Sequence, residues 1–270
     1  GQEFHGWGFT INDEIENLRA AQEHLKIVNL GATAIGTTVT AAPGYPELAV
    51  KNLAELTGID FKNSEDLIAA TSDCGAYMTL SSAIKGLAVK MTKVCNDIRL
   101  LASGPRCGLK EINLPQLQPG SSIMPGKVNP VIPEVTNQAA FLAIGLDTTV
   151  MLAASAGQLE LNVMEPVITF ALYLQMKVLS NACKALREKC VDGIKVNAEH
   201  TKDLVMGSLG IVTLLKPHFG YKPCAAVARE GFLTGKSLHQ LVVEEKGMMT
   251  QEQWDKTFTY ENLINPKFEK

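Results

Sequence analysis

Residues 77–101 read YMTLSSAIKGLAVKMTKVCNDIRLL, and this stretch decides the fold. Its apolar residues recur at alternating steps of three and four, namely Tyr77, Leu80, Ile84, Leu87, Met91, Val94, Ile98 and Leu101. Such heptad spacing is typical of a helix that packs nearly parallel to its neighbours in a bundle. We expect this helix to follow the capping residues of Asn63-Ser64-Glu65-Asp66 and to end at the Ser103-Gly104-Pro105 turn.

Three further segments show helical spacing of apolar residues. The first runs from Ile11 to near Gly31, the second from Asn129-Pro130 to Gly157, and the third from Pro166 to Gly193. No segment shows the sustained period-two alternation that predicts a sheet. Long helices with short connections predict an all-α protein built as a long-helix bundle.

The texture of the chain changes after Gly193, where helical segments become shorter and turns and charges more frequent. The chain has 270 residues, which is enough for one large domain or two modest ones. We therefore expect a central helical-bundle domain over residues 1–193 and a small C-terminal helical domain over residues 194–270.

The charge of the chain argues against two classes of partner. The formal net charge is −3 and no stretch is rich in Lys and Arg, so we expect neither nucleic acid nor an acidic membrane surface as a partner. Residues 128–164 carry only three charges, but their longest uncharged runs are about 12 residues, too short to span a bilayer. A helix with so little charge is expected to be covered by oligomer contacts.

The six cysteines are scattered, with no C-x-x-C pair and no histidine at ligand spacing. This pattern argues against a disulfide framework and against a zinc site. We expect buried structural thiols and a cytoplasmic location, where the compartment is reducing.

Residues 114–130, LPQLQPGSSIMPGKVNP, contain no charge between Leu114 and Gly126 and are punctuated by Pro-Gly pairs, so they predict a loop. Asn129 suits an N-cap and Pro130 the first helical position. A helix N-terminus with Lys127 beside it could hold a small carboxylate. A surface turn with a solvated lysine explains the same spacing, and the residues alone do not decide between the two interpretations.

Residues 120–130, GSSIMPGKVNP, resemble the G-S-S-x-M-P-x-K-x-N-P signature of the aspartase/fumarase superfamily at all eight fixed positions. Residues 29–37, 71–77 and 103–106 are also similar to segments of that superfamily. The resemblance runs the length of the chain, and it also implies that an N-terminal part of the usual protein is absent here.

The resemblance implies a role for each site residue. Ser121 would be the catalytic base; Ser122, Met124, Lys127 and Asn129 would bind substrate; Glu134 and Thr33 would support the site. In many members the glutamate pairs with a histidine, which belongs to the absent part. We expect backbone N–H groups and nearby positive charge to stabilise the serine alkoxide. The resemblance implies no metal and no organic cofactor.

Residues 158–167, QLELNVMEPV, resemble the aspartase branch of the superfamily, with Met-Glu before the proline where fumarases usually carry Phe-Lys. The implied reaction converts L-aspartate to fumarate and ammonia through an aci-carboxylate intermediate. The implied assembly is a homotetramer with shared active sites. Two alternatives remain: a class II fumarase, and a catalytically incomplete or structural protein on the same scaffold.

Overall fold

A computed structural model describes residues 1–265, which form two compact units. Unit 1 contains Glu3–Leu109 and Leu114–Ile194, and unit 2 contains Lys110–Asn113 and the chain from Lys195 onward. The domains expected from the sequence divide at nearly the same place, but they do not separate Lys110–Asn113 from the bundle. The last five residues of the expected C-terminal domain lie outside the described residues.

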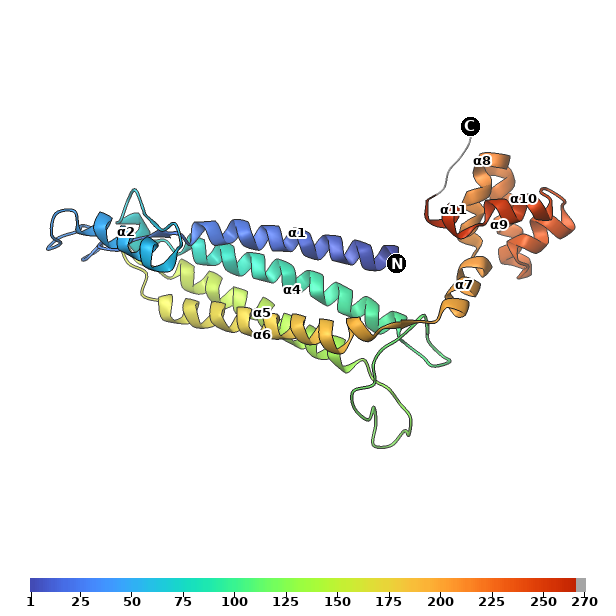
Figure 1. Cartoon of the computed structure of the whole chain (residues 1–270), viewed down its shortest axis with the longest axis horizontal. Coiled ribbons are helices and arrows are strands. Elements are labelled where there is room, and N and C mark those ends of the chain that lie inside the picture. The colour runs from blue at the N-terminus through green and yellow to red at the C-terminus, as the bar shows by residue number, and fades with distance from the viewer. Residues whose placement is uncertain (266–270) are drawn as a thin grey trace. The chain divides into compact units, whose positions relative to one another are not determined.

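Unit 1 is built on long helices that lie side by side (Figure 1). These are α1 (Gln2–His24), α4 (Gly75–Leu101), α5 (Val131–Ser155) and α6 (Glu165–Lys189). The shorter elements are β1 (Ile27–Val28), α2 (Tyr45–Thr57), β2 (Lys62–Asn63), α3 (Ala69–Ser72) and the 3-10 turn η1 (Val191–Gly193). The expected all-helical bundle is confirmed, with the addition of these two-residue strands.

The first helix ends earlier than its apolar spacing predicts. α1 stops at His24, and Ile27 and Val28 pair in parallel with Lys62 and Asn63 instead of continuing the helix to Gly31. β-branched residues favour extended backbone, which explains why the Ile-Val pair leaves the helix. The sequence analysis did not predict the helix α2.

The heptad spacing of residues 77–101 is confirmed in its central part. Ile84, Met91 and Ile98 are buried along α4, whereas Tyr77 near its start is 36% exposed. The helix begins at Gly75, later than Asp66 suggested. The Asp66 carboxylate instead accepts the N–H groups of Ile68 and Ala69 at the start of α3.

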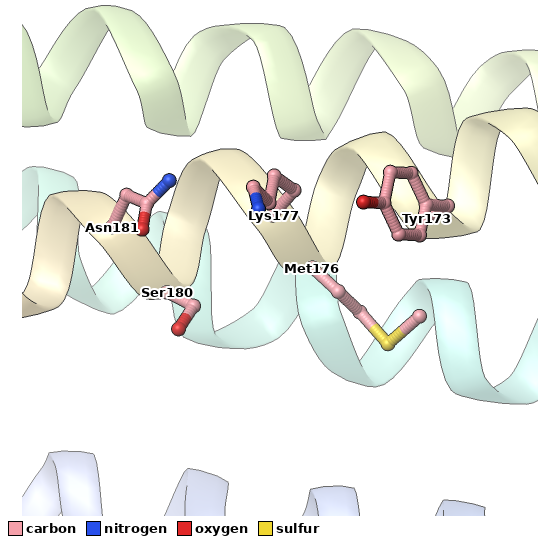
Figure 2. Close-up of a pocket in the computed structure, with 5 residues that line it drawn as sticks. All are labelled: Tyr173, Met176, Lys177, Ser180 and Asn181. Atoms are coloured by element: carbon pink, nitrogen blue, oxygen red, sulfur yellow. The ribbon is translucent and has the colours of Figure 1, made fainter.

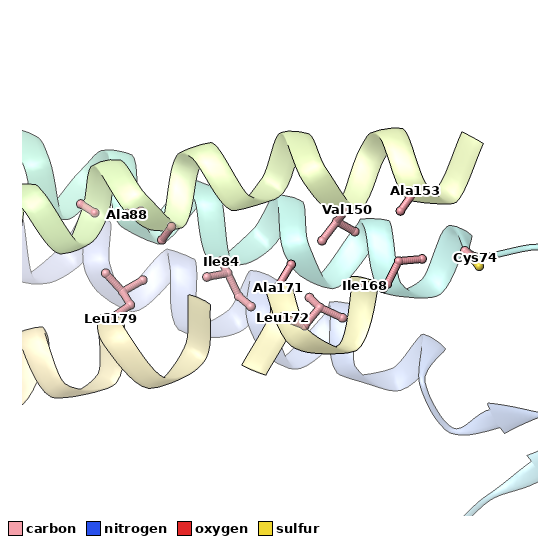
Figure 3. Packing of buried hydrophobic residues seen from close by; sticks show 11 residues of the cluster. Cys74, Ile84, Ala88, Val150, Ala153, Ile168, Ala171, Leu172 and Leu179 are labelled. Carbon is pink, nitrogen blue, oxygen red and sulfur yellow. The ribbon is translucent and has the colours of Figure 1, made fainter. Parts of the chain in front are cut away.

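The core of unit 1 lies between α4, α5 and α6 (Figure 3). Several of its residues are alanines that are completely buried: Ala88, Ala140, Ala143 and Ala171. Small side chains let helix backbones approach closely, and larger ones such as Ile84, Ile168 and Leu179 fill the remaining space.

A polar layer crosses this core. Ser81 of α4 donates to Asp147 of α5 at 2.7 Å, and Lys85 forms an ion pair with the other oxygen of that carboxylate at 2.5 Å. Gln175 of α6 bonds to Ser81 and donates to the carbonyl of Ala143 at 2.9 Å. Because these groups satisfy one another only in one alignment, the layer favours a single register of the three helices.

We predict that Asp147→Ala lowers the free energy of unfolding by about 2 kcal/mol, because it removes a buried charge partner and two hydrogen bonds. Lys93→Ala is the matched control, since it breaks an ion pair with Asp97 in which the lysine side chain is 65% exposed. The control should cost at most about 0.5 kcal/mol. Urea unfolding measures both variants, and equal losses would contradict the role of the polar layer.

The turn between α5 and α6 is held by Asn162, which is 3% exposed. Its amide donates to the carbonyls of Ala153 and Ala154, and its oxygen accepts the N–H of Met164. These bonds satisfy carbonyls at the end of α5 and an N–H at the start of α6, which connects the two helices tightly.

Unit 2 is a set of short helices around Trp254, Leu241 and Val242. Thr250 and Gln253 form a capping box at the start of its helix Gln251–Thr257. Its elements are β3 (Ile112–Asn113), β4 (Lys195–Val196), α7 (Ala198–Gly207), η2 (Leu209–Leu215), α8 (Lys216–Phe219), α9 (Tyr221–Thr234), the π-helix η3 (Gln240–Glu245), α10 (Gln251–Thr257) and α11 (Tyr260–Ile264). β3 and β4 pair antiparallel.

By length and composition alone α5 is long and apolar enough to cross a membrane, a test that core helices also pass. Its inner face packs on α4 and α6 and carries the buried Asp147. Its outer face exposes large apolar side chains, namely Val135, Phe141, Leu142, Met151 and Leu152.

All six cysteines are free, and four of them are buried. Burial raises the pKa of the Cys95 thiol to about 12 and that of Cys190 to about 11. Cys107 departs from the expected pattern, because it lies exposed in the turn after α4.

We predict that iodoacetamide at pH 8 alkylates Cys107 rapidly in the native protein and leaves Cys95 and Cys190 unmodified. Only the thiolate reacts, and the two buried thiols are both inaccessible and protonated at that pH. Peptide mass spectrometry after a timed quench measures each site. Modification of Cys95 at the rate of Cys107 in folded protein would contradict this burial.

Candidate active site

The loop that carries the predicted site residues connects α4 to α5. It lies at the end of the bundle where α4 ends and α5 begins (Figure 1). Its first part rests on η1, the turn that follows α6, because a Cβ on Gly193 would come within 2.5 Å of the ring of Pro115. The bundle therefore sets the position of both ends of the loop.

Ser121 is the loop residue that the sequence analysis predicts to be the base. Its hydroxyl oxygen accepts two backbone N–H groups, from Ile123 at 3.1 Å and from Met124 at 3.0 Å. Two N–H dipoles aimed at one oxygen stabilise negative charge on it. A serine that acts as a base would require such stabilisation, and the role of Ser121 stays a prediction.

Asn129 does not cap α5 as the sequence suggested. The helix begins at Val131 with Pro130 as its N-cap residue, and the amide of Asn129 donates to the carbonyl of Gly120 at 2.6 Å. The proline fixes the start of the helix one residue later, and the Asn129 side chain points back to the loop.

The N-terminus of α5 offers fewer free donors than a regular helix. Val131 donates its N–H to the carbonyl of Asn129, and Pro133 has no N–H. Among the described residues no hydrogen bond is found for the N–H of Ile132. The expected anion site must therefore depend more on Lys127 than on the helix terminus.

The other substrate-binding residues of the prediction lie on the exposed part of the loop. Ser122 and Lys127 are exposed and make no side-chain hydrogen bond within residues 1–265. Met124 is 52% exposed and takes part through its backbone N–H. These side chains are available to a ligand that approaches the loop.

Glu134 lies in the first turn of α5 and is half-buried. Within the described part of the chain its carboxylate makes no hydrogen bond or ion pair. This is consistent with the expectation that its partner belongs to another segment.

Thr33 is not brought near Ser121 in one chain. The segment between α1 and α2 lies at the opposite end of the bundle from the loop (Figure 1). The 27 residues of α4 separate the two ends by about 40 Å. Thr33 has a φ of 55°, unusual for a β-branched residue, and lies in a turn with Ile35, Thr38 and Thr40, which also have positive φ.

A hollow of about 380 Å³ lies on α6 and contains none of the predicted site residues (Figure 2). It is lined by one face of that helix, with Tyr173, Met176, Lys177, Ser180 and Asn181. Within residues 1–265, no three His, Cys, Asp or Glu side chains are placed to hold a metal ion.

Sequence reasoning missed the role of Gly120. A Cβ at this position would lie 2.0 Å from the carbonyl oxygen of Lys127, so the glycine lets the two sides of the loop meet. The sequence shows a glycine before the Ser-Ser pair. Its close approach to the Lys127 carbonyl is apparent only in the folded loop.

The family model for lyases matches residues 1–145, more than half of the chain, including α1, α4 and the loop. The chain belongs to the lyase family. A second model, described as the C-terminus of fumarase C, matches residues 211–265 within unit 2.

Known proteins similar to this chain agree with its membership of the family. The aspartate ammonia-lyase of Escherichia coli K12 is 52% identical over 268 residues, covering 99% of this chain and 56% of the relative. The structure described as a fumarate lyase:delta crystallin from Brucella melitensis, bound to cobalt, has a TM-score of 0.90 at 40% identity, covering 95% of this chain and 55% of the other. The class II fumarase of Schistosoma mansoni has a TM-score of 0.91 at 30% identity, covering 99% and 59%. The chain thus spans about half the length of these proteins.

Proposed function

We propose that the complete protein is an aspartate ammonia-lyase, which converts L-aspartate reversibly to fumarate and ammonia. The observation that carries the proposal is the pair of backbone N–H groups on the Ser121 hydroxyl oxygen. A hydroxyl is too weakly acidic to act as a base unless its alkoxide is stabilised, and these donors provide that stabilisation. The 52% identity to the Escherichia coli aspartate ammonia-lyase supports the choice of substrate.

In the proposed reaction Ser121 removes a proton from Cβ of aspartate. The electrons left on Cβ move into the adjacent carboxylate, which becomes a doubly charged aci-carboxylate. When this intermediate collapses, the Cβ electrons form the double bond of fumarate and the amino group leaves Cα as ammonia.

Lys127 is the cation that we assign to that carboxylate. It is exposed, has no acidic partner among the described residues, and its backbone carbonyl lies against Gly120, the residue before Ser121. Its charge opposes the charge that develops in the intermediate, so its contribution is larger in the transition state than in the ground state. Ser122, Met124 and Asn129 are assigned to binding the rest of the substrate.

We propose that the active site is completed by other segments and other subunits. Glu134 has no partner within residues 1–265, and Thr33 lies at the far end of the bundle, so one copy of this chain does not gather the whole site. The apolar outer face of α5, with Phe141 57% and Leu152 60% exposed, suits the packing of further copies. A homotetramer with shared active sites accounts for both features.

We also propose a cytoplasmic location for the complete protein. The six free thiols support it, because a reducing compartment keeps such cysteines unpaired.

The test is the addition reaction catalysed by the complete protein, followed by loss of fumarate absorbance with identification of the product. We predict that fumarate with ammonium yields aspartate and that fumarate in water alone yields nothing. The 270-residue chain assayed by itself is the matched control, and we expect little or no turnover from it.

The other products distinguish the remaining candidates. Malate formed without ammonium would show a fumarase, which the Schistosoma mansoni likeness and the fumarase C match keep as the second candidate. No product from the complete, folded protein would favour a structural role on the same scaffold.

A further inference from the structure

Residues 120–129 form a loop that closes on itself. Its two ends meet at a narrow point, the base of the loop, where Gly120 lies against Lys127. A Cβ on Gly120 would lie 2.0 Å from the carbonyl oxygen of Lys127 and 2.5 Å from its carbonyl carbon. Real side chains do not approach backbone atoms this closely, so only the hydrogen of glycine fits. Gly120 does not have a positive φ, so this contact, and not the local backbone conformation, is what requires glycine.

A second contact closes the same base. The amide of Asn129 donates to the carbonyl of Gly120 at 2.6 Å, and Asn129 is half-buried where it does so. Lys127 and Asn129 flank a single residue, so both contacts reach Gly120 from the same short stretch. They join Gly120 to the residues that lead into α5.

Few contacts besides these two orient the tip of the loop, which contains residues 121–126. Ile123 is 85% exposed and Met124 is 52% exposed, so their side chains are not packed into a core. The hydrogen bonds that Ser121 accepts come from within the tip itself. The direction in which Ser121 points therefore depends on the base of the loop.

We propose that Gly120 and Asn129 form a clasp that holds Ser121 in position, with Gly120 as a positioning residue. Asn129 then has a role beyond the substrate binding assigned to it, because its amide fixes the loop before any substrate arrives. The catalytic consequence of the clasp rests on the proposed function, whereas the clasp itself can be tested without it.

The first test uses the 270-residue chain. Gly120→Ala forces the base apart by steric contact, and Asn129→Leu keeps a similar volume but removes the hydrogen bond. Tryptic cleavage after Lys127, followed by mass spectrometry, should rise about fivefold or more in both variants. Amide exchange at Ile123 and Met124 should accelerate by a similar factor.

Gln118→Ala is the matched control, because this exposed side chain in the same loop makes no hydrogen bond among the described residues. It should leave cleavage and exchange unchanged. Exchange at Val150 in the core reports whether a variant remains folded. Wild-type rates in both Gly120→Ala and Asn129→Leu would overturn the clasp.

The second test uses the complete protein. Gly120→Ala alters no atom assigned to substrate contact, so we expect kcat to fall about tenfold or more while KM changes less than about twofold. An unchanged kcat in a variant whose loop exchanges faster would overturn the positioning role. If the wild-type protein proves not to act on aspartate, the cleavage and exchange rates still decide whether the clasp exists.

Discussion

The packing of α5 between α4 and α6 is the constraint on which the rest of the structure depends. Completely buried alanines on these helices allow close approach, and the Ser81–Asp147–Gln175 layer favours one register. A slip of one helical turn would move the start of α5 by about 5.4 Å. The loop ends where α5 begins, so such a slip would displace Asn129 from Gly120.

The rigid bundle and the loop that carries the candidate catalytic residues are thus distinct parts of the structure. The bundle fixes the loop at Pro115 against Gly193 and at the start of α5, and the loop closes on itself between Gly120 and Asn129. The tip between them carries the serine, with donors from its own backbone. A loop with no charge between Leu114 and Gly126, carried on a rigid scaffold, can adjust to a substrate while its ends stay in place.

Much of the fold followed from the sequence because helix packing leaves a periodic pattern. The spacing of Ile84, Met91 and Ile98 predicted the buried face of α4, and the turn residues at Ser103-Gly104-Pro105 predicted its end. The signature at residues 120–130 located the candidate loop. The two-residue strands left no such pattern, since Ile27 and Val28 find their partners 35 residues away.

The details of the site were less predictable, because they depend on contacts between residues that are distant along the loop. Asn129 had the properties of an N-cap, but in the folded chain its amide bonds to Gly120, nine residues earlier. The turn around Thr33 also involves a contact that is distant in the sequence, because Gly36 lies against the backbone of Ile68. Glu134 makes no hydrogen bond or ion pair through its carboxylate within residues 1–265, so the fold of this chain identifies no partner for it.

The central claim is that Ser121 is the base, and the most direct measurement compares Ser121→Ala with Ser122→Ala in the complete protein. The account predicts that Ser121→Ala lowers kcat by about 10³-fold or more at an unchanged melting temperature. Ser122→Ala, which removes the same hydroxyl one residue later, should change KM more than kcat. Turnover retained in folded Ser121→Ala would contradict the account.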